Sequence, residues 1–239
     1  ESAMAAIDIA KDISEGLARN ACACEINGVV KDLRTVVDGD CELNILTAND
    51  EACLAACRHT TAHVLAQAIK RLYPDAKCAI GPAIAEGFYY DFDIQPLDRD
   101  ALDAIEKEMK KIIKENPAIE RFELPRAEAI ALMEERGENF KVELINDLPE
   151  DAILSFYKQG EYIDLCAGPH LMNMKNIKAY KLTSSSMAYW RGDSNKARLQ
   201  RVYGTAYPKN EDLAAHLERM EDAKRRDHNR LCREMKLFL

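Results

Sequence analysis

The sequence of 239 residues lacks any apolar run near the ~20 residues that span a bilayer. It also lacks a signal-peptide pattern, because Lys11, Asp12 and Glu15 interrupt the first short apolar stretch. No internal repeat or low-complexity segment is present. Apolar residues make up 47% and charged residues 31%, the balance of a globular chain with a sizeable core. We therefore expect a cytoplasmic protein without a membrane partner.

The eight cysteines include no CxxC pair, the spacing typical of many zinc and thiol-redox motifs. A chain of this size and apolar content does not need disulfides to stabilise its core. We therefore expect reduced thiols, most of them acting as small core side chains.

The chain as a whole lacks the basic character of a general nucleic-acid binder, since its net charge is −8. Residues 171–209 are an exception, because they carry eight basic side chains against the single acid Asp193. Aromatic residues are interleaved with these cations. Cations contact phosphates and aromatic faces stack on unpaired bases, so the segment suits a single-stranded nucleic-acid end. An ordinary sheet surface with core aromatics explains the composition equally well.

Residues 1–47 are predicted to form a small α/β unit. Apolar positions over 5–13 indicate a short helix that Gly16 closes. Asn27-Gly28 is a strong hairpin signal, and alternation over 41–46 indicates a half-buried strand. The chain starts inside the first helix with no strand before it, so we expect this unit to lack its own beginning.

Residues 50–208 predict a mixed α+β domain. Apolar spacing of three and four, with the breakers Pro74 and Gly137, places helices at 50–73, 100–115 and 126–136; Asn49 and Asp50 supply the first N-cap. Strand patterns occur at 87–94, 141–145, 153–157, 162–165, 178–183 and 198–203.

Residues 209–239 predict a long charged helix from Glu211 to near Lys236. The helix reaches the end of the chain without a cap. Together with the abrupt start, this favours a fragment in which the helix connects to a further domain.

Histidine is scarce, with five in the chain, so its placement is informative. His59 and His63 lie four residues apart in a predicted helix, so both imidazoles share one face, away from Leu65 and Ile69. Such a pair on its own is more often structural than catalytic. Because the core side of the helix faces away from both histidines, we expect either to tolerate alanine without a large loss of stability.

The segment 164–170 supplies a thiol and a third imidazole, because Gly168-Pro169 predicts a turn that brings Cys166 and His170 to one point. A thiol beside imidazoles tends to have a lowered pKa, so we expect Cys166 to face a cleft and to react faster than Cys78. Three imidazoles and one thiol fit tetrahedral zinc and also acid–base catalysis on a water molecule. We call this set the quartet: His59, His63, Cys166 and His170.

A series of motifs in this order resembles the N-terminal part of bacterial threonyl-tRNA synthetases. They are RHTTAH at 58–63, AIGP at 79–82, GFYYD at 87–91, GENFK at 137–141, DLCAGPH at 164–170, AYWRGDS at 188–194, RVYGTA at 201–206 and KRRDH at 224–228. The resemblance covers essentially the whole chain.

The resemblance implies three parts. Residues 1–47 resemble the ubiquitin-like β-grasp TGS domain without its first strands, and residues 50–208 resemble an editing domain of helices and antiparallel sheet, as in threonyl and alanyl enzymes. Residues 209–239 resemble the linker helix toward an aminoacylation domain that this chain lacks.

The resemblance also implies a proofreading activity. Serine fits a pocket built for threonine, because one missing methyl group gives only about 10–200-fold discrimination. The family therefore hydrolyses the ester of seryl-tRNA(Thr) at a second site and spares threonyl-tRNA(Thr). The implied partner is the serine-carrying acceptor end of tRNA(Thr), with no DNA.

Residue by residue, the resemblance assigns catalysis to His59, His63, Lys141, Asp164, Cys166 and His170, and substrate binding to Tyr90, Arg191 and Lys196. Lys141 would stabilise negative charge, and Asp164 would orient an imidazole or bind the seryl amine. Tyr90 would bind the terminal adenosine or close the pocket. Arg191 and Lys196 flank a predicted exposed turn, in a basic segment that we expect beside the quartet.

Related alanyl modules hold zinc with a matching set, whereas the threonyl family edits without it. We therefore expect no metal at the quartet, with zinc as the alternative. ATP, magnesium and the synthetase's own zinc belong to the absent aminoacylation domain, through which the parent enzyme forms homodimers.

Two alternatives stay open from the sequence. The chain can be a freestanding trans-editing deacylase, or a non-catalytic acceptor-stem binding module in which the quartet is structural.

Overall fold

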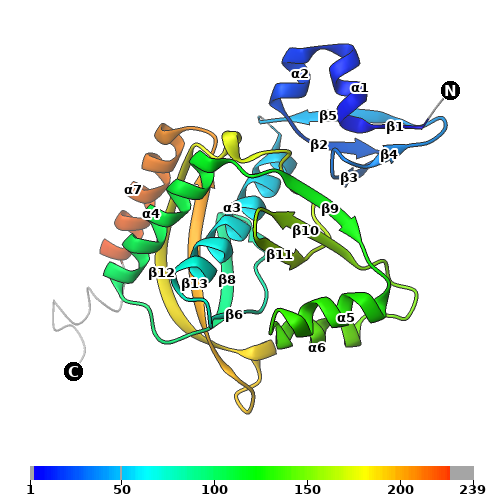
Figure 1. Cartoon of the computed structure of the whole chain (residues 1–239). Coiled ribbons are helices and arrows are strands. Elements are labelled where there is room, and N and C mark those ends of the chain that lie inside the picture. The colour runs from blue at the N-terminus through cyan, green and yellow to red at the C-terminus, as the bar shows by residue number, and fades with distance from the viewer. Residues whose placement is uncertain (1–2, 49, 227–239) are drawn as a thin grey trace, which may run out of the picture.

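The N-terminal part combines two small sheets with two short helices, seen in blue in Figure 1. The computed structural model describes residues 3–48 and 50–226. Within the N-terminal part, the elements are β1 (Met4–Ala5), α1 (Ala6–Ile13), α2 (Glu15–Asn20), β2 (Ala21–Ile26), β3 (Val29–Lys31), β4 (Val36–Val37) and β5 (Leu43–Thr47). Strand β2 lies between β3 and β5, antiparallel to both, and β1 pairs with β4.

Local sequence explains most of this unit. Asn27 and Gly28 both have positive φ, at 50° and 79°, as a two-residue turn between twisted strands requires. Two expectations were wrong. A strand, β1, precedes the first helix, and Gly16 lies inside α2 rather than closing α1, because the Ser14 hydroxyl accepts from the Gly16 and Leu17 amides and starts a new helix.

The larger part combines two antiparallel sheets with five helices. Its elements are α3 (Glu51–Leu72), β6 (Lys77–Cys78), β7 (Ala83–Ile84), β8 (Gly87–Asp93), α4 (Arg99–Glu115), β9 (Ile119–Glu123), α5 (Arg126–Glu135), α6 (Asn139–Asp147), β10 (Ser155–Gln159), β11 (Tyr162–Leu165), β12 (Ala179–Tyr189), β13 (Arg198–Tyr207) and α7 (Asn210–Arg225), with 3-10 turns at Met174–Asn176 and Trp190–Gly192. One sheet runs β12-β13-β8-β6 with β7 beside β8, and the other runs β11-β10-β9.

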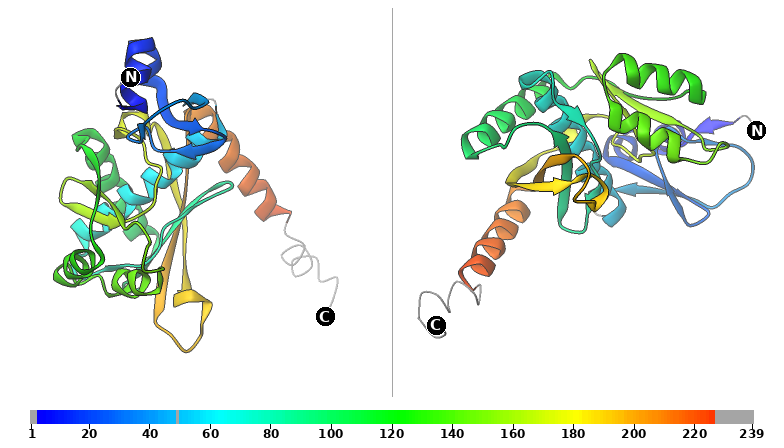
Figure 2. Two further views of the ribbon diagram at one scale, coloured as in Figure 1. Left: turned by 90° about the vertical axis from the view of Figure 1, so that its right-hand side faces the viewer. Right: turned by 90° about the horizontal axis from the view of Figure 1, so that it is seen from below.

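Helix α3 is the centre of the molecule. It packs against β8 and β13 of the larger sheet, against α4, and against β11 of the smaller sheet. Both views in Figure 2 show α7 projecting away from the body. Side chains around most of α3 are buried, as expected for a helix enclosed by other elements, so polar residues such as Thr60, His63 and Gln67 face protein rather than water.

The mixed α+β class and most elements agree with the sequence prediction, with a few corrections. Residues 141–145 are part of α6 and not a strand, while β12 and β13 run further than predicted and β10 begins later. The predicted C-terminal helix is seen as α7 up to Arg225; its remainder, together with Asn49 and Cys232, lies outside the described residues. None of the described helices has the length and apolar character needed to cross a membrane.

Close contact between β8 and β13 generates a prediction. A Cβ atom on Gly87 would overlap the Gly204 carbonyl oxygen, a backbone atom that cannot move without disturbing β13. We expect Gly87→Ala to lower the free energy of unfolding by about 1–3 kcal/mol, measured by urea denaturation.

Gly16→Ala is the matched control, because its added Cβ would meet only the Ser14 hydroxyl oxygen, at 3.4 Å. In helix α2 this change should leave stability unchanged or raise it by about 0.5–1 kcal/mol. Equal stability of the two variants would contradict the proposed backbone overlap.

Candidate active site

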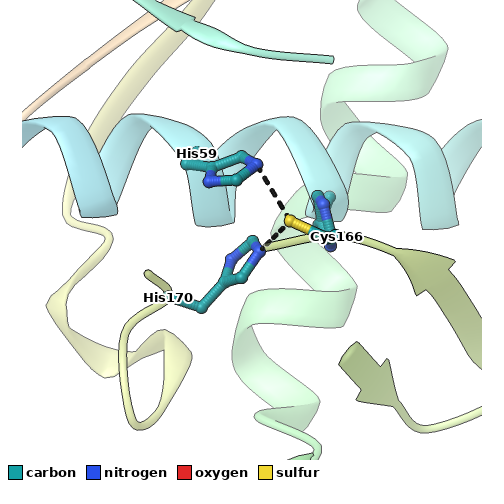
Figure 3. A group of neighbouring side chains, drawn as sticks. His59, Cys166 and His170 are labelled. Carbon is teal, nitrogen blue, oxygen red and sulfur yellow. Dashed lines mark hydrogen bonds between the residues drawn. The ribbon is translucent and has the colours of Figure 1, made fainter. Parts of the chain in front are cut away.

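The quartet converges at one point, where α3 meets the loop that follows β11. The Cys166 Sγ atom lies 3.3 Å from Nε2 of His59 and 3.3 Å from Nε2 of His170 (Figure 3). One ligand-type atom from each of the four side chains lies within 4.8 Å of the others. The predicted meeting of Cys166 and His170 is confirmed, and the helical pair joins them.

The loop geometry depends on Gly168, whose φ is +77°. A Cβ there would overlap the Tyr157 hydroxyl, so both the backbone conformation and the space favour glycine. The Gly168 amide donates to Cys166 Sγ at 3.3 Å. This turn therefore aims the thiol and the His170 imidazole at the same spot.

Thr60 fixes the tautomer of His170. Its hydroxyl donates to the Ala56 carbonyl at 2.8 Å and accepts from the Leu171 amide at 3.0 Å. The hydroxyl proton is thus used, so the contact of 3.2 Å between Thr60 Oγ1 and His170 Nδ1 requires the imidazole to donate. The lone pair of His170 is then on Nε2 and faces the Cys166 thiol.

Burial keeps the imidazoles neutral. It lowers the pKa of His59, lowers that of His63 to about 3, and lowers that of His170 well below its ordinary value. At neutral pH all three rings therefore carry a lone pair that can accept a proton. His59 is the most accessible of the three, since His63 is 2% and His170 1% exposed.

The expected low pKa of Cys166 is wrong. Burial and the Asp164 carboxylate raise the pKa of the thiol to about 12, because its imidazole neighbours are neutral and supply no positive charge. Because of this raised pKa, the Cys166 thiol is a protonated hydrogen-bonding group at neutral pH. Its side chain is half-buried. Cys78, its comparison residue, is fully inside the core.

Beside the quartet lies a buried ion pair. Lys141 Nζ is 2.6 Å from Asp164 Oδ1, and both side chains are about 4% exposed or less. Burial disfavours the charged form of both side chains, but the attraction between the two opposite charges outweighs this cost. The pKa of Lys141 is therefore raised, and the pKa of Asp164 is lowered. His63 Nε2 lies 3.5 Å from Asp164 Oδ2, which links the pair to the quartet.

Tyr90 and Tyr162 hold the other side of the carboxylate. Their hydroxyls donate to Asp164 Oδ2 at 2.6 and 3.0 Å. Tyr90 is completely buried: its ring packs in the core and its hydroxyl orients Asp164. Its role toward a terminal adenosine or in closing the pocket stays a prediction. Sequence reasoning missed Tyr162, although strand alternation with Asp164 places both on one face.

His63 also departs from expectation, because it is enclosed rather than on an open helix face. Its Nδ1 atom has no hydrogen-bond partner among the described residues. Replacing His63 by alanine therefore leaves a cavity and should lower the free energy of unfolding. The expected small effect on stability applies to the half-buried His59 rather than to His63.

Arg191 and Lys196 lie at an exposed turn, as predicted, but their charges are partly neutralised. Arg191 pairs with Asp147 and, at 3.2 Å, with Glu143, and Lys196 lies 3.5 Å from Glu143. These acids come from α6, which also carries Lys141. The internal pairing weakens the case for both cations as RNA ligands.

Other cations gather along α4. Lys107, Lys110 and Lys114 line one groove together with Lys178, and all four are exposed. Residues 3–48 and 50–226 provide no salt-bridge partner to any of them. Lys178 belongs to the basic segment predicted from the sequence.

Comparisons with known proteins define the class. Residues 1–47 match the TGS domain family, and residues 154–203 match the family of the threonyl and alanyl tRNA synthetase second additional domain. The chain therefore joins a TGS domain to a synthetase editing domain, and the second match contains β10, β11, Cys166 and His170.

Over its whole length the chain is homologous to the N-terminal region of threonine–tRNA ligases. It is 58% identical to that of Acetivibrio thermocellus over 232 residues, 97% of this chain and 36% of the relative. It is 56% identical to that of Clostridioides difficile over 240 residues, 100% of this chain and 38% of the relative. The chain thus spans little more than a third of the length of these relatives.

The buried imidazoles generate a pH prediction. His63 titrates near its ordinary pKa of 6.5 when unfolded and at about 3 when folded, so its contribution to stability is complete above 6.5 and is lost as the pH falls toward 3. At about pH 5 this single group should cost about 2 kcal/mol of unfolding free energy relative to neutral pH.

Urea unfolding of the wild type and His63→Gln at both pH values measures this cost. The loss of unfolding free energy between neutral pH and pH 5 should be smaller in the variant by about that amount. Comparing the two proteins removes the contribution of the other groups that titrate. Equal losses in the two proteins would show that His63 is already protonated, or already exposed, in the folded state.

Proposed function

We propose that this chain hydrolyses the ester bond of seryl-tRNA(Thr) and spares threonyl-tRNA(Thr). The observation that carries the proposal is the convergence of three neutral imidazoles and a protonated thiol beside a buried ammonium, inside the editing domain. Similarity to threonine–tRNA ligases supports threonine as the amino acid whose ester with tRNA the site must leave intact.

The site contains the groups that ester hydrolysis requires. Its most accessible imidazole, His59, would accept a proton from a water molecule as the water oxygen attacks the ester carbon. The Lys141 ammonium would stabilise the resulting oxyanion. The intermediate then collapses: the bond from carbon to the ribose oxygen breaks, and the proton on His59 passes to that oxygen.

Single-turnover deacylation of seryl-tRNA(Thr) tests the proposal. We expect His59→Ala to reduce the rate constant by about 10²–10⁴-fold, the usual contribution of a positioned acid–base group. His216→Ala is the matched control and should leave the rate unchanged. His216 is a buried histidine of α7 whose ring packs at a tilt against Tyr207, 5.3 Å between ring centroids.

The alternatives give different results. A binding module would retain seryl-tRNA(Thr) without hydrolysing it, and wild-type protein that does so would refute the enzymatic proposal. Comparable hydrolysis of threonyl-tRNA(Thr) would refute the selectivity while keeping the reaction.

We propose that the tRNA acceptor end is held partly by the lysines along α4. Helix α4 packs directly on α3, which carries two members of the quartet. Cations without an internal partner contact phosphates at less cost than Arg191 or Lys196, which would first leave their carboxylates. The free thiols of the seven described cysteines fit the reducing cytoplasm as the location.

The quartet's donor set also fits zinc, because three imidazole nitrogens and one sulfur match a tetrahedral site. His63 Nδ1, which has no hydrogen-bond partner within 3–48 and 50–226, is an atom that a metal or a water molecule would satisfy. Bound zinc would supply a Lewis acid and a water of lowered pKa.

We nevertheless propose that editing here needs no metal. The Cys166 thiol, the His170 ring and the Thr60 hydroxyl already form a hydrogen-bonded chain that orients the site, and the Lys141 ammonium supplies positive charge.

Elemental analysis of purified protein, combined with deacylation in the presence of a chelator, tests this point. We expect sub-stoichiometric zinc and an unchanged rate after chelation. One zinc per chain that disappears in His59→Ala, with activity restored by added zinc, would overturn the metal-free proposal.

A further inference from the structure

A carboxylate of the TGS domain enters the editing site. Asp32 lies between β3 and β4, yet its side chain is 6% exposed because it points into the neighbouring domain. Its Oδ2 atom accepts from the backbone amide of His170 at 3.0 Å and from the Tyr157 hydroxyl at 2.9 Å. Asp32 thus binds the loop that carries one member of the quartet.

Arg34 extends the same contact. Its guanidinium donates to the Ile119 carbonyl at 2.6 Å and to the Leu171 carbonyl at 3.2 Å, and it pairs with Asp32 at 3.0 Å. The Arg34 amide donates to Asp32 Oδ1 at 2.8 Å. The two side chains therefore bind the TGS domain to the backbone of the editing domain at the His170 amide and at the Leu171 carbonyl.

His170 is consequently held from two directions. Thr60 of α3 binds its ring nitrogen Nδ1 and the following amide, while Asp32 binds its own amide. No other described residue hydrogen-bonds the His170 amide, so loss of Asp32 frees the loop to rotate. Such a rotation would move the His170 Nε2 atom away from Cys166. A buried carboxylate is unfavourable unless it is fully hydrogen-bonded, and here both oxygens of Asp32 accept from donors.

We propose that Asp32 is a positioning residue for editing: the TGS domain completes the site by fixing the backbone of His170. This inference rests on the proposed deacylase function. Asp32 touches neither ester nor water, so its loss should lower kcat and leave KM for seryl-tRNA(Thr) nearly unchanged.

Asp32→Asn is the sharpest variant. It keeps the size of the side chain, but one acceptor oxygen becomes an NH2 group that faces donors, so one side of the contact must break. We expect a 10–100-fold fall in kcat, the usual effect of removing a group that orients an active-site ligand. Asp38→Asn, an exposed carboxylate of the same domain, is the control and should behave as the wild type.

Arg34→Lys is a second variant that guards against misfolding. Arg34 is partly exposed, and lysine keeps the charge while losing the planar fork that reaches two carbonyls. We expect a smaller fall in kcat, again without a change in KM. Thermal melting of each variant establishes that it is folded.

The outcomes separate the two proposals. Absence of hydrolysis by the wild type removes the deacylase function itself. If the wild type is active, a folded Asp32→Asn variant with wild-type kcat, or a loss expressed only in KM, overturns the positioning role. If Asp32→Asn does not fold, Arg34→Lys decides by the same readings.

Discussion

The buried carboxylate of Asp164 is the interaction on which the site depends. It accepts from the Lys141 ammonium of α6, from the Tyr90 hydroxyl of β8 and from the Tyr162 hydroxyl of its own strand, and it faces His63 of α3. Elements of both sheets therefore converge on one negative charge. Removing a charge of this kind from water costs several kcal/mol, and a complete set of donors offsets that cost only when all these elements are in place.

Burial around that carboxylate sets the chemistry of the quartet. The imidazoles are neutral and the Cys166 thiol is protonated, so the site holds proton acceptors next to one fixed ammonium. Such an arrangement suits attack by a water molecule on an ester. A nucleophilic thiolate is not favoured, because the raised pKa of Cys166 leaves almost no thiolate at neutral pH.

The domains are connected through the same site. The TGS domain contributes a carboxylate and a guanidinium to the loop that carries His170, while α4, which packs on α3, carries three lysines without a salt-bridge partner among the described residues. The pairing of Arg191 with acids of α6 shows why the basic segment could not be interpreted from charge alone, since charge counts do not reveal which cations are neutralised.

The sequence by itself determined the local pieces: the Asn27-Gly28 hairpin, the i, i+4 spacing of His59 and His63, and the turn at Gly168. These features depend on backbone conformations and helical periodicity, which neighbouring residues control. Family resemblance then predicted roles for Lys141 and Asp164, which spacing did not show.

Tertiary structure decided the rest. Lys141 lies in helix α6, where Phe140 and Leu144, four residues apart, pack against the cluster that contains Trp190. Polar and apolar residues alternate over 141–144, so the same segment also matches a strand pattern. The burial of Tyr90, the raised pKa of Cys166 and the reach of Asp32 into the editing domain all depend on residues far away in the chain. Solvation and long-range partners fix protonation and accessibility, and neither can be obtained from local sequence patterns.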